Sequence, residues 1–287
     1  MRNITLAARM LLKTPFVTTI AILSLALGIG ANAAIYSMFD QLLRRPLPVP
    51  EPSRLVNLAA PGPMPGSNSC NQTGGCDEVF SYAMFRDLEK AQPAGFSGIA
   101  AHRLTGVSLG IRNEPSTAEA MLVSGSYFPV LGLAPAAGRL LSPADDQVIG
   151  AGFVTVISHR LWDDKFGRDP SVVGQSIIVN GKSFQVIGVA PEGFDGTTAG
   201  ARPALYVPIS MRGELARFTQ FDNRRNYWVY LFARLAPGVT AAEAATTVNG
   251  VYRPIIADIE APLQEGMSAT TMQGFKAKTV NLAPGAR

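Results

Sequence analysis

The hydrophobic pattern of the chain is dominated by one stretch near its N-terminus. Residues 16–39 form a run of 24 positions without a charge or a histidine. A helix rises about 1.5 Å per residue, so a run of this length crosses a hydrocarbon core about 30 Å thick. Its Thr, Ser and Asn side chains are tolerated in lipid when they bond to the backbone or to a neighbouring helix. The pattern predicts a transmembrane helix with Phe16 and Phe39 at its ends.

Small residues recur along one side of this predicted helix. Ala26, Gly30 and Ala34 are spaced by four positions, and such a ridge lets a second helix approach closely. Small residues are also common in membrane spans that use them for no contact, so both interpretations stay open. Asn32 lies on a neighbouring face, where its amide is suited to a hydrogen bond between helices.

Residues 1–15 carry the pattern of an amphipathic helix. At 100° per residue, Arg2, Arg9 and Lys13 fall in one narrow sector. The apolar residues opposite them are Ile4, Ala7, Ala8, Leu11 and Leu12. This pattern predicts a helix in the headgroup plane of an anionic leaflet. It favours a cytoplasmic N-terminus, although the pair Arg44–Arg45 beyond the span weakens the positive-inside count.

A cleaved secretory signal is the alternative for this region. The basic start and the tripeptide Ala31-Asn32-Ala33 fit a signal peptide with an A-x-A cleavage site. However, the apolar run continues to Phe39 and is longer than the 7–15 residues of a signal core. We therefore expect an uncleaved anchor and keep cleavage as the competing hypothesis.

Beyond the span, residues 40–52 are rich in proline and residues 53–283 alternate between strand and helix patterns. Proline occupies every second position from Pro46 to Pro52, which predicts an extended stalk. The expected strands are 54–60, pieces within 97–123, 153–158, 175–179, 183–189, 227–235 and a last one near 270–282. The first expected helix begins at Asp77 or Ser81 and ends near Gln92. Further helical segments are expected over 126–132, 159–166 and 240–252, and Pro254 ends or kinks the last of them.

Two local signals within this region are specific. Asn180-Gly181 between two β-rich runs predicts a hairpin with a type I′ turn. Thr240 followed by Glu243 forms a capping box that begins a helix. Because strands and helices are interspersed without regular alternation, we expect an α+β domain.

Charge and cysteine content narrow the function further. The net charge is +4, and no basic run exceeds Arg44–Arg45 or Arg224–Arg225, so nucleic acid is not an expected partner. The only two cysteines are Cys70 and Cys76. In an exported domain they would close a small loop as a disulfide worth roughly 2–3 kcal/mol; two free thiols are the alternative.

Two motifs resemble a catalytic or nucleotide-binding site, and each lacks a required part. Gly106-Val-Ser108-Leu-Gly110 matches a hydrolase nucleophile motif, but no helix start follows it and the only later histidine is His159. Lys182-Ser183 ends like a phosphate-binding loop, yet Ser176 stands where glycine is required. The predictions are therefore no catalytic, cofactor-binding or metal site.

The histidines and paired aspartates support the same conclusion. His102 and His159 have no nearby cluster of other ligands in the sequence, so we interpret them as structural or surface residues. Asp145–Asp146 and Asp163–Asp164 lack the spacing of a calcium loop. They are interpreted as a solvated loop and the polar face of a helix.

Several blocks together resemble one family. They are residues 25–56 (LALGIGANAAIYSMFDQLLRRPLPVPEPSRLV), 124–146 (SGSYFPVLGLAPAAGRLLSPADD), 156–196 without Arg168 and 233–244 (ARLAPGVTAAEA). In order and spacing they resemble the MacB-like, FtsX-type permeases of ABC transporters, over essentially the whole chain. The cysteines are not part of the family pattern.

The resemblance implies one membrane helix followed by a periplasmic core domain. A porter-like part would comprise residues 53–123 and 227–283, and a β-rich insertion residues 124–226. It implies that the protein is located in the bacterial inner membrane, with a cytoplasmic N-terminus and a periplasmic domain. It further implies that the protein relays ATP-driven movement without being an enzyme itself.

The implied partners are membrane lipid, a separate cytoplasmic ABC ATPase, further permease spans, periplasmic adaptor proteins and a second copy of the chain as a homodimer. Family members continue into three more spans, so the resemblance implies a truncated permease or a fragment of one. The alternative is an anchored or secreted extracytoplasmic binding module or hydrolase, which requires Ser108 and His159 to meet in a pocket.

Overall fold

The computed structural model describes residue 13 and residues 15–43, 47–70, 75–112 and 114–285. The chain divides into two compact units, residues 1–45 and 46–287, and each is described by itself. The amphipathic helix predicted over residues 1–15 lies almost wholly outside the described residues.

The first unit contains the helix α2 (Pro15–Leu43) of 29 residues. Its segment Pro15–Ser37 is long and apolar enough to cross a membrane. The predicted apolar helix over residues 16–39 therefore exists. Large apolar side chains such as Phe16 and Leu27 are each 77% exposed, as suits a helix whose surroundings are lipid or other helices.

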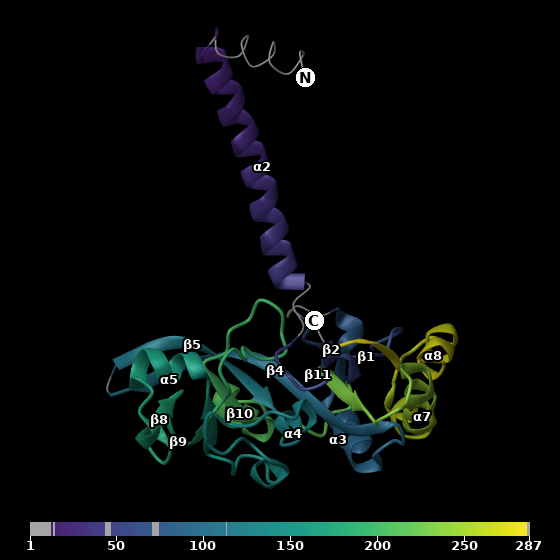
Figure 1. The fold of residues 1–287 in the computed structure, drawn as a ribbon. Helices are drawn as coiled ribbons and strands as arrows, with labels where there is room; N and C mark the ends of the chain where they lie inside the picture. The colour runs from purple at the N-terminus through teal and green to yellow at the C-terminus, as the bar shows by residue number, and fades with distance from the viewer. Residues whose placement is uncertain (1–12, 14, 44–46, 71–74, 113, 286–287) are drawn as a thin grey trace. The chain divides into compact units, whose positions relative to one another are not determined.

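In its described residues, the second unit is built on one mixed sheet of twelve strands, and Figure 1 shows how the strands lie. Its main path is β12-β1-β11-β4-β5-β10-β7-β9-β6, and β2, β3 and β8 pair beside it. The strands are β1 (Leu55–Ala59), β2 (Ser67–Asn68), β3 (Val79–Ser81), β4 (Phe96–Ile111), β5 (Glu114–Val123), β6 (Ala137–Gly138), β7 (Val154–Ile157), β8 (Ser176–Val179), β9 (Lys182–Val189), β10 (Leu205–Pro208), β11 (Asn226–Leu235) and β12 (Asn281–Pro284).

The hairpin β4–β5 joins the two ends of this sheet. The first part of β4 pairs with β11, from Phe96 to His102, and its last part pairs with β8 at Leu109 and Gly110. One hydrophobic cluster extends from the β1 end to the β9 end, so the sheet is covered along its length. The division of the domain into a porter-like part and a β-rich insertion, with boundaries at residues 123–124 and 226–227, stays a prediction.

Helices flank the sheet, and their ends follow local sequence signals. Ser81 and Ser158 cap α3 and α5 by accepting from the backbone N–H three residues on, and Thr240 with Glu243 forms the predicted capping box of α7. The helices are α3 (Tyr82–Ala91), α4 (Tyr127–Leu131), α5 (His159–Phe166), α6 (Arg212–Ala216), α7 (Ala241–Pro254) and α8 (Ala269–Lys276).

The predicted hairpin is confirmed with its turn type. Asn180 and Gly181 both have positive φ, 48° and 79°, as a type I′ turn requires. Strands β8 and β9 pair antiparallel on either side of the turn.

Two expectations about the chain path differ from the structure. Residues 47–52 do not form an extended stalk: they turn, Val49 is buried and Glu51 adopts φ 45°. Residues 269–276 form helix α8, so the last strand begins only at Asn281. Ser268 caps that helix, and Phe275 on the helix is fully buried. Burial of this side chain in the domain outweighs the β-propensity of Thr270 and Thr271.

Candidate functional site

The junction segment, residues 47–54, is the first described part of the second unit after helix α2. It ends in the short 3₁₀ helix η1 (Pro52–Arg54). Val49 is packed in a hydrophobic cluster with residues of α4. The Pro50 ring lies next to Gly132, 3.7 Å from a Cβ built at that glycine. The segment is therefore part of the domain's packed surface.

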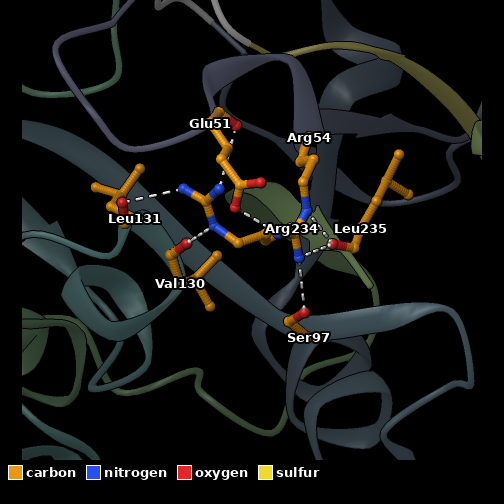
Figure 2. Close-up of polar contacts among 7 residues, drawn as sticks. All are labelled: Glu51, Arg54, Ser97, Val130, Leu131, Arg234 and Leu235. Atoms are coloured by element: carbon orange, nitrogen blue, oxygen red, sulfur yellow. Dashed lines mark hydrogen bonds and ion pairs between the residues drawn. The ribbon is translucent and has the colours of Figure 1, made fainter. Parts of the chain in front are cut away.

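Arg234 holds the junction segment from below, as Figure 2 shows. It lies on β11 and is only 8% exposed. Its Nε donates to the carbonyl of Val130 at 2.6 Å, Nη2 to that of Leu131 at 3.0 Å and Nη1 to that of Glu51 at 3.2 Å. Val130 and Leu131 form the last turn of α4, where carbonyls lack helical partners and a cation is favourable. One guanidinium thus joins β11, α4 and the junction segment.

Arg54 makes a second link from the junction segment to the sheet. Its Nε and Nη2 donate to the carbonyl of Leu235 at 3.0 and 2.7 Å. Its Nη1 forms an ion pair with Glu51 at 2.5 Å, and Nη2 reaches the Ser97 hydroxyl at 3.4 Å. The two arginines with Glu51 are called the arginine clamp below.

Two positive charges lie in the clamp, and Glu51 is its one negative charge. Burial lowers the pKa of Arg234, and the nearby Arg54 lowers it further, whereas Glu51 raises it. Arginine remains charged at neutral pH in any case. Most of the bonds of both cations go to backbone carbonyls, so the clamp fixes chain path and offers no reactive group.

A cleft of about 440 Å³ adjoins the clamp and is lined by Arg234, α3, α4 and the loop 143–147. Its charged groups are mutually satisfied: Arg86 and Glu89 form an ion pair at 2.7 Å, and Glu89 accepts from Ser126 at 2.9 Å. Burial raises the pKa of Glu89.

Asp146 in this cleft differs from the solvated loop predicted for it. The residue is 3% exposed, and its carboxylate accepts from the backbone N–H of Gly125 at 3.1 Å and of Ser210 at 3.0 Å. Burial raises its pKa. It fastens three loops, whereas its neighbour Asp145 pairs with Arg139 at 2.7 Å.

The structure does not bring the hydrolase candidates together. Ser108 lies on the regular strand β4, and its N–H donates to the Asn180 side chain at 2.7 Å. His159 begins α5 and packs on Trp162. Within the described residues, Ser108 and His159 lie on different elements and contact different partners, so the arrangement required for hydrolysis is not seen in this part of the chain.

The remaining motif residues have structural surroundings. Lys182 begins β9 and forms an ion pair with Glu214. His102 is buried against Tyr230 and Phe232, and burial lowers its pKa to about 4. Among the described residues, no cluster of three or more metal-ligating side chains occurs.

The other predicted site residues lie as follows. Ala26, Gly30 and Ala34 are exposed along α2, and no neighbour lies within 4 Å of a Cβ built at Gly30; their use as a packing ridge stays a prediction. Cys70 and Cys76 are joined by a disulfide in the structure, with Cα atoms 4.8 Å apart. Its formation in the exported protein stays a prediction.

The arginine clamp does not follow from any of the sequence motifs above. One signal for it exists: Arg234 is the only charge in the apolar strand sequence YWVYLFARL. A charge in a buried strand needs partners, but its partners lie as far as 183 positions away in the sequence. No local pattern identifies them.

Comparison with known proteins agrees with the fold. The sequence profile of the MacB-like periplasmic core domain family matches residues 18–251. The fold is similar to the periplasmic region of MacB from Actinobacillus actinomycetemcomitans, with a TM-score of 0.51 and 16% identity over 71% of this chain and 84% of that one. It is also similar to a domain of a permease protein from Porphyromonas gingivalis, with a TM-score of 0.52 and 14% identity over 82% and 92%. No curated protein matches.

The class that emerges is the extracytoplasmic domain of an ABC transporter permease, preceded by an apolar helix. The chain belongs to the family of MacB-like periplasmic core domains. The resemblance read from the four sequence blocks is thereby confirmed, as is the expected α+β class.

Proposed function

We propose that this protein is a permease component that relays ATP-driven movement from the membrane to its extracytoplasmic domain. It would sit in the bacterial inner membrane through residues 16–39, with a cytoplasmic N-terminus. Its partners would be a cytoplasmic ABC-type ATPase, further permease spans, a second copy of the chain and a periplasmic adaptor.

The arginine clamp is the observation that carries this proposal. A relay requires that the segment following the membrane helix be fixed to the domain, because slack would absorb the movement. Arg54 binds β11 and β4, and Arg234 of β11 binds the Glu51 carbonyl, through hydrogen bonds of 2.7–3.4 Å. Arg234 also binds α4, so the segment, the sheet and this helix are joined. Charged hydrogen bonds of this kind are worth about 1.5–3 kcal/mol each, enough to keep the segment attached while the helix moves.

The alternative of an extracytoplasmic hydrolase has no comparable support, because Ser108 lies in a regular strand and is bonded to the Asn180 turn. Within the described residues, the arginine clamp supports the relay, whereas no assembled catalytic site supports hydrolysis.

Reconstitution tests the proposal. The full chain, a partner cytoplasmic ABC-type ATPase and the remaining permease spans are assembled in proteoliposomes, and ATP turnover is measured with and without this protein. We expect turnover to depend on the protein and to fall at least several-fold in an Arg54→Gln/Arg234→Gln double variant that still assembles. Arg168→Gln, at an exposed ion pair with Asp163, is the matched control. Turnover that is indifferent to the protein's presence would contradict the proposal.

A further inference from the structure

A second cleft lies along the middle of the β4–β5 hairpin, at Arg103–Gly106 of β4 and at Glu119 and Leu122 of β5. It measures about 690 Å³ and is lined by residues of β4, β5, α6 and the loop 198–201 between β9 and β10. The polar residues that matter here are Arg103, Thr198, Arg212 and Glu119. We call it the Arg212 groove.

Arg212 is a cation for which the described residues provide no countercharge. Its guanidinium lies 3.6 Å from the ring centroid of Phe218 and 3.8 Å from that of Trp228. Its Nη1 is shielded from solvent, and no described residue offers it a hydrogen-bond acceptor. Burial, with the neighbouring Arg103, lowers its pKa to about 9, so the group is still charged at neutral pH. An unpaired, partly buried cation is costly, and an aliphatic side chain would fill the same space without that cost.

Arg103 adds a second positive charge to the groove. Its Nη1 donates to the carbonyls of Ser69 and Trp228, both at 2.9 Å, and neither acceptor carries a charge. Glu119 also lines the groove, but no ion pair joins it to either arginine in the described residues. The charge of Arg103 lowers the pKa of Arg212, and two guanidiniums in one groove together attract an anion.

A third group in the groove has an unused hydrogen-bonding capacity. Thr198 is 7% exposed, and its buried hydroxyl has no hydrogen-bond partner in the described part of the chain. A buried hydroxyl without a partner is unusual in a native domain. It would be satisfied by an acceptor oxygen placed in the groove.

We propose that the Arg212 groove binds the oxyanion of a ligand, a phosphate or a carboxylate, between Arg212, Arg103 and Thr198. The planar guanidinium matches the oxygens of both anions in a two-pronged arrangement. Leu104, Leu122 and Ala201 line the remainder of the groove and would contact the apolar part of the ligand. The inference does not rest on the proposed relay, because the test measures binding to the resting protein.

The site has a structural consequence if the predicted division of the domain holds. Arg103 and Trp228 belong to the predicted porter-like part, and Thr198, Arg212 and Phe218 to the predicted insertion. A bound oxyanion would therefore fasten the two parts together.

Trp228 provides the assay, because it is fully buried and stacked on Arg212. The full chain with Trp162→Phe keeps Trp228 as its single tryptophan and is purified in a neutral detergent. Inorganic phosphate, acetate and dihexanoyl phosphatidic acid are titrated at constant ionic strength while Trp228 emission is recorded. We expect a saturable change, at least tenfold weaker affinity in Arg212→Lys and Arg103→Gln, and an unchanged curve in Arg168→Gln.

The arms of the titration distinguish the sources of the oxyanion. Equal affinity for phosphate and the short-chain lipid indicates a free anion, and an affinity at least tenfold higher for the lipid indicates a headgroup with its chains. A linear response to all three probes overturns the proposal, as does a saturable one that both variants retain. Should Arg212→Lys not fold, Arg103→Gln decides alone, since the Arg103 side chain is not part of the stack of Arg212, Phe218 and Trp228. Unchanged affinity in that variant overturns the proposal.

Discussion

Replacing Arg234 by methionine should destabilise the domain by about 3 kcal/mol. The side chain donates to three carbonyls, two of them at 2.6 and 3.0 Å in the last turn of α4. Charged hydrogen bonds contribute about 1.5–3 kcal/mol each, so the two short ones sum to roughly 3–6 kcal/mol. Relief of the buried charge offsets part of this loss, which places the expected value at the lower end.

Two further substitutions calibrate this prediction. Arg54→Met should cost about 1 kcal/mol, because the Arg54 side chain is 23% exposed and water replaces part of what it loses. Arg168→Met, at a surface ion pair whose side chains are about half exposed, should change stability by at most about 0.5 kcal/mol. The order of the three costs follows from burial alone.

Urea denaturation of the full chain in a neutral detergent measures the three variants, with tryptophan emission as the signal. Trp228 lies on β11 with Arg234, so its environment reports on the same strand. The denaturant slope should stay constant and the midpoint should shift. A cost for Arg234→Met within about 0.5 kcal/mol of wild type, or no larger than that of Arg54→Met, would refute the reasoning.

Two further outcomes follow from buried groups elsewhere in the domain. Glu260 is 1% exposed, and burial raises its pKa from 4.5 to about 7 despite Arg224 and Lys278 nearby. The folded state therefore binds this proton more tightly than the unfolded state does. The resulting stabilisation is present below pH 4.5 and is lost as the pH rises through 7. Wild type should lose roughly 3 kcal/mol more stability than Glu260→Gln between pH 4.5 and 7.5, and parallel pH profiles from thermal melts would contradict this. Cys70 and Cys76 should be unreactive to thiol labelling in the denatured, unreduced exported protein, and stoichiometric labelling of both would show them unpaired.

Local sequence signals predicted much of the secondary structure because each acts within a few residues. The Asn180-Gly181 turn needs only two residues of positive φ, and the Ser158 cap of α5 needs only a hydroxyl three positions before a backbone N–H. The apolar run of α2 depends on composition alone. Such features do not depend on what the rest of the chain does.

Features set by distant partners could not be predicted in this way. Proline alternation suggested an extended stalk, but Arg234, far along the chain, holds the Glu51 carbonyl and turns the segment onto the domain. Asp146 is buried because the N–H groups of Gly125 and Ser210 converge on it. The site proposed at Arg212 likewise depends on Phe218 and Trp228 meeting across the fold.

Hydrogen–deuterium exchange on the assembled transporter tests the relay most directly. Exchange is compared between the nucleotide-free state and the state trapped with ATP and vanadate, in wild type and in the Arg54→Gln/Arg234→Gln variant. The relay predicts nucleotide-dependent changes in strands β7–β9 of the wild type, and their loss in the variant while changes near α2 persist. Identical nucleotide-dependent changes in β7–β9 of both proteins, or none in the wild type, would contradict it.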